Sequence, residues 1–353
     1  MVGCSPASAP NSRNRPAPDL YAASPKTDVD TDAIGKIDRC PPPEDFRPEE
    51  VEIRSSGLDV VAWHANTGDR NELVVFLHGR KGWPDNNKGI LRTAAYAGYR
   101  AIGLQHRTVP SVVERCEGVD AEDFAECVEE THAAKIYGSE HGAYLNVPDY
   151  QSVVSHLHRR LVRLDQLYPN EGWSVYFETM PPLASQHENY IHWDQIIVGG
   201  FSAGAGDATM MARDLPLRGV VLHSGPVDQL DWVSEGQTPG DSHFAFRHAD
   251  EERTEEMRLN AGNLNIPGEP YEFDPNRVGL TWDAFVGLGT QQFVSALEPH
   301  PACEQDDPVH SSMARTDCMN VDDAKGEEPY GLVRPYLYAY FSLGTPHPGR
   351  NDR

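Results

Sequence analysis

Short runs of apolar residues alternate along this chain with longer segments in which apolar positions recur every three or four residues. Runs that are apolar throughout indicate strands buried on both faces of a sheet, and the helical period indicates helices packed on that sheet. The predicted strands cover residues 58–63, 72–79, 99–104, 195–201, 217–226, 242–247 and 291–297. The predicted helices cover residues 89–97, 150–168, 203–212 and 332–343. This alternation predicts an α/β fold with a mostly parallel sheet and right-handed crossovers.

Three segments interrupt the pattern. Residues 1–45 are rich in Pro, Ser, Ala and Asp and lack an apolar period, which predicts a disordered N-terminal tether. Residues 105–150 are polar and irregular, and they predict a cap-like insertion ahead of the strand at 195–201. Residues 346–353 form a predicted C-terminal tail. The remaining span, 46–345, is long enough for one large α/β domain.

The charge balance narrows the class of partner. The formal net charge is −24 with a pI near 4.9, and only six of the 30 basic residues are lysine. Such a chain repels phosphates, so nucleic-acid binding is excluded as a function. The sequence also contains no apolar run of the length that spans a bilayer.

The six cysteines suggest a compartment. Four of them form two pairs that are close in sequence and are predicted to be disulfides, Cys116 with Cys127 and Cys303 with Cys318. A fifth, Cys40, is left over. The sixth, Cys4, follows Gly3 as at the end of a bacterial lipoprotein signal, although no apolar stretch precedes it. We therefore expect an extracytoplasmic protein, either periplasmic, anchored to the outer membrane by lipid on Cys4, or secreted.

The sharpest local signal is a turn of small residues at 199–206 that carries one serine, Ser202. In the pattern Gly200-x-Ser202-x-Gly204, the glycines allow a turn so tight that a Cβ would strike the neighbouring strand and helix. The helix predicted next aims its first N–H groups at Ser202, where the amide of Ala203 would stabilise an oxyanion. This arrangement predicts a nucleophile elbow.

A serine nucleophile needs a histidine to accept its proton. In folds with a nucleophile elbow, the catalytic residues follow along the chain in the order Ser, acid, His, and the histidine stands on a loop after the last strand. His310 lies in that window, between the strand at 291–297 and the terminal helix. His300 is the other histidine there, but prolines on both sides constrain it. His310 is therefore the predicted base.

The acid that orients the histidine is harder to place, because Asp and Glu are abundant after the serine. Asp250 follows the strand at 242–247 and is the preferred candidate. Glu251 is adjacent and could replace it, and Asp228 follows the preceding strand, which is a second position for such an acid. A second oxyanion donor is expected from the loop after the early strand, where the sequence His78-Gly79-Arg80 points to the amide of Arg80.

These motifs resemble the α/β-hydrolase superfamily, within a group of bacterial, secreted hydrolases. The resemblance covers about residues 70–345 and is carried by residues 76–79, 94–99, 168–173, 200–204 and 224–228 together with His310. It implies an eight-stranded, mostly parallel sheet, a serine acyl-enzyme mechanism and no cofactor. Two features depart from the superfamily: Phe201 stands where histidine is common, and the interval from Gly79 to Ser202 is longer than usual.

The expected activity is hydrolysis of a small or medium carboxylic ester, as in esterases and lipases, through Ser202, His310 and Asp250. An amidase or peptidase would use the same residues. A catalytically inactive hydrolase fold that serves as a binding module is an alternative of a different class. We expect no bound metal, a small-molecule ester as the partner, and contact with a membrane only through Cys4. The sequence leaves the oligomeric state open.

Overall fold

The computed structural model describes residues 51–56, 58–64, 72–139, 142–179, 187–228, 236–273, 285, 287–319 and 334–343. These residues build one sheet whose strands are β1 (Val51–Ser56), β2 (Asp59–His64), β3 (Leu73–Leu77), β4 (Arg100–Leu104), β5 (Ile196–Phe201), β6 (Gly219–His223), β7 (His243–His248), β8 (Tyr271–Phe273) and β9 (Gln292–Ser295). The strand order is β1-β2-β4-β3-β5-β6-β7-β9-β8. Strand β2 is antiparallel to both of its neighbours, β1 and β4, and every other pairing is parallel.

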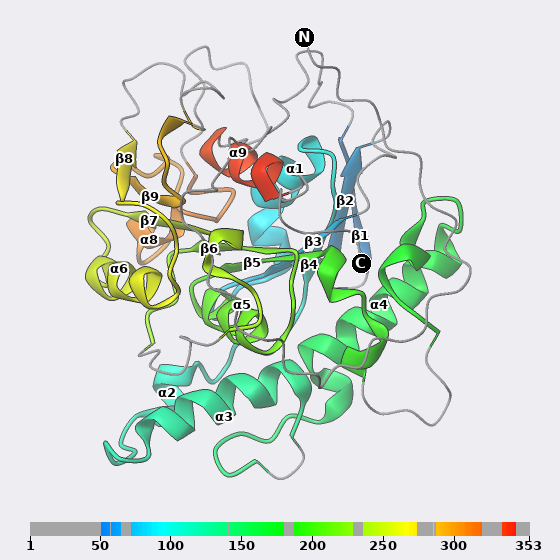
Figure 1. Cartoon of the computed structure of the whole chain (residues 1–353), viewed down its shortest axis with the longest axis horizontal. Helices are drawn as coiled ribbons and strands as arrows, with labels where there is room; N and C mark the ends of the chain where they lie inside the picture. The colour runs from blue at the N-terminus through cyan, green and yellow to red at the C-terminus, as the bar shows by residue number, and fades with distance from the viewer. Residues whose placement is uncertain are drawn as a thin grey trace, which may run out of the picture.

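Helices cover both faces of this sheet (Figure 1). The helices of the described residues are α1 (Lys88–Tyr96), α2 (Val112–Cys116), α3 (Phe124–Tyr137), α4 (Val153–Leu167), α5 (Ala203–Asp214), α6 (Thr254–Asn263), α8 (Pro308–Ser311) and α9 (Arg334–Leu343). The alternation of side chains along β3 explains the two layers. Leu73, Val75 and Leu77 enter the core shared with α4 and α5, whereas Val74 and Phe76 enter the core shared with α1 and α9.

The predicted α/β class with a mostly parallel sheet is confirmed. The sheet has nine strands among the described residues, where eight were expected. The additional elements, β1, β8 and α6, gave weak signals for different reasons. β8 has only three residues, β1 alternates apolar and charged positions over no more than four residues, and α6 buries a polar residue, Asn260, beside Met257 and Ala261.

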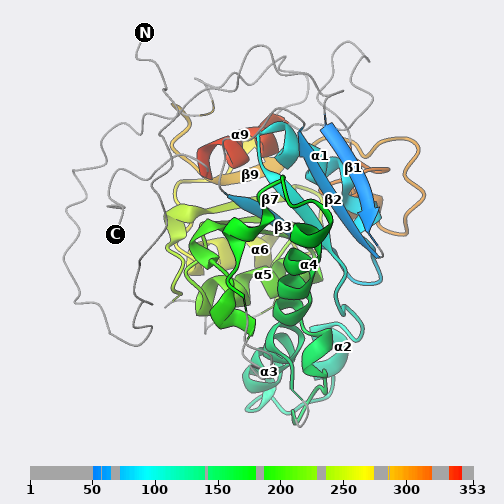
Figure 2. The same cartoon turned by 90° about the vertical axis from the view of Figure 1, so that its right-hand side faces the viewer.

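The segment at 105–150 differs from the irregular insertion that we expected, because it contains the helices α2 and α3. Figure 2 shows both helices at a distance from the sheet, beyond the end of α4. The buried side of α3 carries Thr131, His132 and Lys135 next to Cys127, Val128 and Ile136. Polar residues at buried positions erase the apolar period, so the sequence did not reveal this helix.

Both predicted disulfides are present, one between α2 and α3 at Cys116–Cys127 and the other at Cys303–Cys318. Cys4 and Cys40 lie outside the described residues, as do the predicted tether at 1–45 and tail at 346–353. None of the helices within the described ranges combines the length and apolar character needed to cross a membrane. Location outside the cytoplasm and lipidation of Cys4 remain predictions.

Candidate active site

The turn between β5 and α5 has the geometry predicted from the glycine pattern. Ser202 adopts φ 56° and ψ −119°, a strained conformation for a residue with a side chain. A Cβ on Gly200 would lie 2.2 Å from the carbonyl oxygen of Gly204, and a Cβ on Gly204 would lie 2.2 Å from the carbonyl oxygen of Leu77. Both glycines are therefore required for α5 to sit directly against the carboxyl end of β3.

Replacement of Gly204 by alanine is expected to lower the free energy of unfolding by about 3 kcal/mol or more, because the clash is with backbone that cannot rotate away. Gly262→Ala is the matched control. Gly262 lies in α6 with open space around its Cβ position, so alanine there should stabilise the protein by up to about 1 kcal/mol. Chemical denaturation of both variants measures the difference. Equal midpoints for Gly204→Ala and the wild type would contradict the close approach.

His310 follows β9 and precedes the terminal helix, as predicted, but it lies in the four-residue helix α8 rather than in a loop. The side chain of Asp307 caps this helix by accepting a hydrogen bond from the backbone N–H of His310 at 2.9 Å. The imidazole packs on the ring of Phe201, with 4.8 Å between centroids. His310 and Ser202 line the same cleft, which has a volume of about 370 Å³. The structure therefore brings the predicted nucleophile and base to one site.

The carboxylate that meets His310 in the structure is that of Glu251, and not that of Asp250, which the sequence favoured. Glu251 Oε1 lies 2.7 Å from His310 Nδ1, and Glu251 Oε2 accepts a hydrogen bond from the backbone N–H of His248 at 2.7 Å. The Glu251 side chain is almost completely buried, whereas that of Asp250 is 80% exposed and comes no closer than 4.0 Å to His248. Asp228, the third candidate, contacts a different histidine, His132.

The loop after β3 lines the cleft, as expected for an oxyanion-binding loop. Two of its amides are already used: Gly82 N–H donates to the Gly79 carbonyl at 3.0 Å, and Lys81 N–H donates to Thr108 Oγ1 at 3.2 Å. Arg80 directly precedes them and lines the cleft, while its guanidinium pairs with Glu114 of α2. Hydrogen bonding by Ser111 and Arg80 lowers the pKa of Glu114 to about 2, so this partner of Arg80 is a carboxylate.

Ala203, the other predicted oxyanion donor, is the first residue of α5. An amide in the first turn of a helix has no acceptor within that helix, and the helix dipole adds positive potential there. The elbow places this amide directly after Ser202. The position suits stabilisation of a negative oxygen on the atom that Ser202 would attack.

One wall of the cleft was not foreseen in the sequence. It comes from the loop closed by the Cys303–Cys318 disulfide, which contributes Gln305, Asp306, Asp307, Ser311 and Arg315 besides His310. Asn86 and Asn87 also line the cleft, together with Gly79, Arg80, Lys81 and Gly82. Phe201 is the one large apolar side chain among the lining residues. In the sequence, the cysteines at 303 and 318 bracket His310, and this spacing was the feature that could have predicted that a closed loop around His310 forms this wall.

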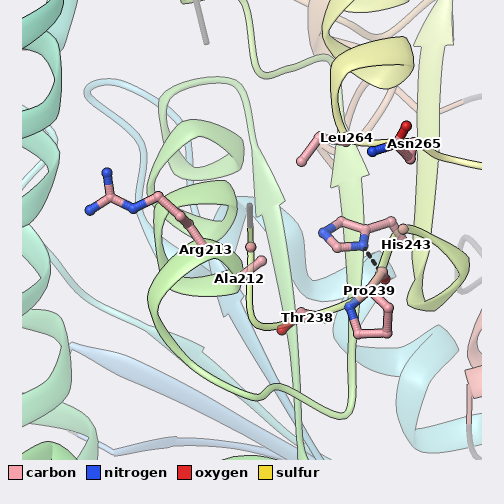
Figure 3. Close-up of a pocket in the computed structure, with 9 residues that line it drawn as sticks. Ala212, Arg213, Thr238, Pro239, His243, Leu264 and Asn265 are labelled. Atoms are coloured by element: carbon pink, nitrogen blue, oxygen red, sulfur yellow. Dashed lines mark hydrogen bonds between the residues drawn. The ribbon is translucent and has the colours of Figure 1, made fainter. Parts of the chain in front are cut away.

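A smaller cavity of about 140 Å³ lies elsewhere, between the end of α5 and β7 (Figure 3). It is lined by Ala212, Arg213, Gly236, Thr238, Pro239, Gly240, His243, Leu264 and Asn265. His243 Nδ1 lies 3.0 Å from the Pro239 carbonyl, and burial lowers the pKa of His243 to about 4, so this imidazole is neutral. The Thr238 hydroxyl accepts from the Leu217 amide and donates to the Leu215 carbonyl, so it is already engaged, and we assign the cavity no role.

The strand order with β2 antiparallel, the serine elbow between β5 and α5, and the histidine after β9 together define an α/β-hydrolase fold. Comparison of the sequence with protein-family models gives no match, nor does comparison with curated proteins. Among solved structures, the chain is similar to a bacterial heroin esterase, with 13% identity and a TM-score of 0.41 over 86% of this chain and 87% of the other. It is also similar to esterase B from Lactobacillus rhamnosis, with 13% identity and a TM-score of 0.41 over 85% and 88%. Neither likeness bears on the activity of this chain.

Proposed function

We propose that this protein is a serine hydrolase that cleaves carboxylic esters, with Ser202, His310 and Glu251 as its catalytic triad. The observation that carries the proposal is the 2.7 Å contact between His310 Nδ1 and the buried carboxylate of Glu251, in the cleft that Ser202 lines. A carboxylate buried behind a histidine, with a strained serine beside them, is the constellation that nucleophilic catalysis requires.

The orientation of His310 sets the direction of proton transfer. Because a carboxylate only accepts hydrogen bonds, His310 Nδ1 carries the proton and donates it to Glu251 Oε1. The other nitrogen, Nε2, then has a free lone pair and can take the proton of Ser202 as its oxygen attacks the ester carbon. The amides of Ala203 and Arg80 hold the oxyanion of the tetrahedral intermediate.

Collapse of that intermediate expels the alcohol, which takes the proton from His310 and leaves an acyl group on Ser202. Water then attacks the acyl carbon while His310 accepts its proton. The second intermediate releases the acid, and His310 returns the proton to Ser202. The cycle restores the free enzyme and consumes one water per ester.

The lining of the cleft favours a short acyl group and a polar alcohol. A long acyl chain would require an extended apolar groove to remove its methylene groups from water, at about 0.8 kcal/mol for each buried CH₂. Phe201 alone offers large apolar surface, whereas amide, carboxylate and basic groups occupy the other walls. Lys81 lines the cleft and has no ion-pair partner among the described residues, so it is available to a polar or anionic substrate.

We further propose that the protein acts outside the cytoplasm. Disulfides form and persist in oxidising compartments and are rare in the reducing cytosol. The support is the pair of disulfides, one of which closes the loop that carries His310.

The direct test is reaction of the wild-type protein with a fluorophosphonate, followed by peptide mass spectrometry, together with hydrolysis of p-nitrophenyl esters from acetate to laurate. We expect labelling at Ser202 and a kcat/KM for acetate or butyrate about tenfold or more above that for laurate, because only short chains fit a polar cleft. Absence of both labelling and hydrolysis would instead indicate a binding module. Faster cleavage of an anilide than of the matching ester would indicate an amidase.

A further inference from the structure

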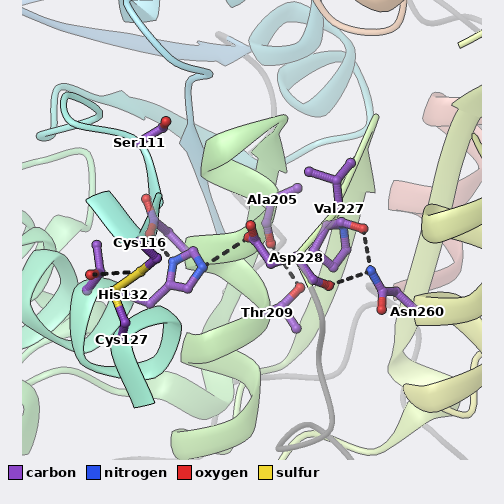
Figure 4. A network of polar contacts seen from close by, with 12 residues as sticks. Ser111, Cys116, Cys127, His132, Ala205, Thr209, Val227, Asp228 and Asn260 are labelled. Atoms are coloured by element: carbon purple, nitrogen blue, oxygen red, sulfur yellow. Dashed lines mark hydrogen bonds and ion pairs between the residues drawn. A yellow bond between two sulfur atoms is a disulfide. The ribbon is translucent and has the colours of Figure 1, made fainter. Parts of the chain in front are cut away.

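A second histidine outside the triad is buried between two carboxylates. His132, on α3, has Nδ1 2.7 Å from Asp207 Oδ1 of α5 and Nε2 3.2 Å from Asp228 Oδ2, which follows β6. The side chains of His132 and Asp207 are buried, and that of Asp228 is 10% exposed. In Figure 4 the ring of His132 lies between the Cys116–Cys127 disulfide and Asp228.

This contact pattern fixes the protonation state of His132. Each carboxylate accepts a hydrogen bond, so both ring nitrogens must donate and the imidazole is positively charged. Burial alone would lower the pKa of His132, but the hydrogen bonds to Asp207 and Asp228 raise it above its usual value. Burial would likewise raise the pKa of Asp207, but the charge of Lys135 and the interactions with His106 and His132 hold it far below its usual range.

The buried carboxylates of this cluster face basic groups of α3. His132 lies within hydrogen-bond distance of both Asp207 and Asp228, and the charge of Lys135 acts on Asp207. Lys135 is one turn along α3 from His132 and is buried as deeply, at 1% exposure each, but its Nζ makes no hydrogen bond among the described residues. A buried ion is tolerated only when it is paired, so removal of His132 leaves Asp207 without its nearest partner inside the protein. The segment at 105–150 therefore contributes the imidazole that joins the two carboxylates.

The cluster touches both segments that supply the oxyanion amides. On one side, Asp207 lies one turn along α5 from Ala203. On the other, His106 Nε2 lies 3.5 Å from Asp207 Oδ2, and the rings of His106 and His78 are 4.4 Å apart between centroids. His78 stands two residues before Arg80 and is neutral, since burial and the neighbouring His106 lower its pKa to about 3. A chain of contacts thus runs from the loop after β3 to α5 and on to α3.

The imidazolium also lies directly against the elbow helix. A Cβ on Gly206 would come within 2.7 Å of His132 Cε1 and 3.1 Å of Asp228 Oδ2. Only a glycine at this position lets α5 approach the ring so closely. The position of α5 is therefore determined by His132 as well as by the sheet.

We propose that His132 is a positioning residue: held between Asp207 and Asp228, it fixes the start of α5 relative to the loop of Arg80 and so sets the spacing of the oxyanion amides. The inference rests on the proposed function, because it assigns His132 a part in that reaction. If His132 has this role, the segment at 105–150 contributes to the geometry of the active site through the side chain of His132.

The test compares His132→Gln with His243→Gln, using acetate ester turnover, fluorophosphonate labelling and thermal unfolding. His243 is a buried histidine of the smaller cavity, remote from the cluster, and controls for the loss of a buried imidazole. The oxyanion amides act mainly on the transition state and little on the bound ester. Displacing them should therefore lower kcat and leave KM nearly unchanged, so we expect His132→Gln to lower kcat about 10- to 100-fold with KM within about twofold. His243→Gln should keep kcat within about twofold, even at a similar loss of Tm. A wild-type kcat in folded His132→Gln would overturn the proposal.

Asp228→Asn provides a second variant that keeps the histidine and removes one charge facing it. A histidine whose pKa is raised by folding stabilises the native state below its unfolded pKa, about 6.5, and this stabilisation is lost as the pH rises through the folded pKa. The other groups that face the cluster are Asp207, Lys135 and His106. Without the Asp228 carboxylate, the pKa of His132 in the folded protein falls, because one of the two groups that raise it is lost. The kcat and Tm of Asp228→Asn should therefore decline at a lower pH than those of the wild type. Coincident pH profiles would contradict the proposal.

The two proposals fail in different ways. Wild-type protein that neither hydrolyses esters nor reacts with a fluorophosphonate contradicts the proposed function. Wild-type protein that does both, with His132→Gln and His243→Gln equally active, contradicts only the positioning role.

Discussion

Replacement of Ser202 by alanine is expected to lower kcat/KM for a short acyl ester by about 10⁴-fold or more. The variant loses the oxygen that would form the acyl-enzyme and changes no packing in the core. The residual rate would come from the oxyanion amides and substrate binding. Turnover of p-nitrophenyl acetate measures the loss, and fluorophosphonate labelling at residue 202 should disappear with it.

Ser224 offers a matched control for this substitution. It directly follows β6, the neighbour of the elbow strand, and has φ 48°, close to the value of 56° at Ser202. Its hydroxyl is buried and makes no hydrogen bond among the described residues, and it does not line the cleft. Ser224→Ala should therefore keep kcat/KM within about twofold. If Ser202→Ala retained more than a tenth of the wild-type rate, the serine mechanism would be wrong.

Replacement of Glu251 by glutamine is expected to lower kcat by about 10²- to 10⁴-fold. Glutamine retains an acceptor for the His248 amide, so the local fold should persist, but it carries no charge to stabilise the imidazolium of His310. Its amide can also donate to His310 Nδ1, which favours the wrong tautomer. Steady-state kinetics with the acetate ester measure the effect, with circular dichroism to confirm that the variant is folded.

Asp250→Asn is the control for the acid, since it changes the neighbouring carboxylate and leaves Glu251 in place. Because the Asp250 side chain is 80% exposed and does not contact His310, its kcat should stay within about twofold of the wild type. The opposite ranking, with Asp250→Asn impaired and Glu251→Gln active, would return the acid to the position that the sequence favoured.

Much of the architecture could be predicted from the sequence because it depends on local patterns of residues. The apolar runs at 73–77 and 196–201 are strands whose every residue is buried, so no other element could accommodate them. Gly200 and Gly204 were required by a turn whose backbone atoms nearly touch. His310 was found by elimination, as the less constrained of two histidines after the last strand, and the cysteine pairs by their short spacing.

The choice between Asp250 and Glu251 could not be made in this way. Adjacent residues at the end of β7 point in different directions, and only the fold decides which of them turns inward to His310. The sequence offered two carboxylates with equivalent spacing. The tertiary structure buried one and exposed the other.

The sequence by itself determined the central strands of the sheet, the elbow and the position of the late histidine, since these depend on hydrophobic period and on steric limits within a few residues. The tertiary structure decided which carboxylate meets His310, the polar wall at 305–315 and the helix α3 with His132. These features depend on which charged groups face each other after folding, and that pairing joins residues such as His132 and Asp207, 75 positions apart. A charge buried against its partner leaves no periodic trace in the sequence.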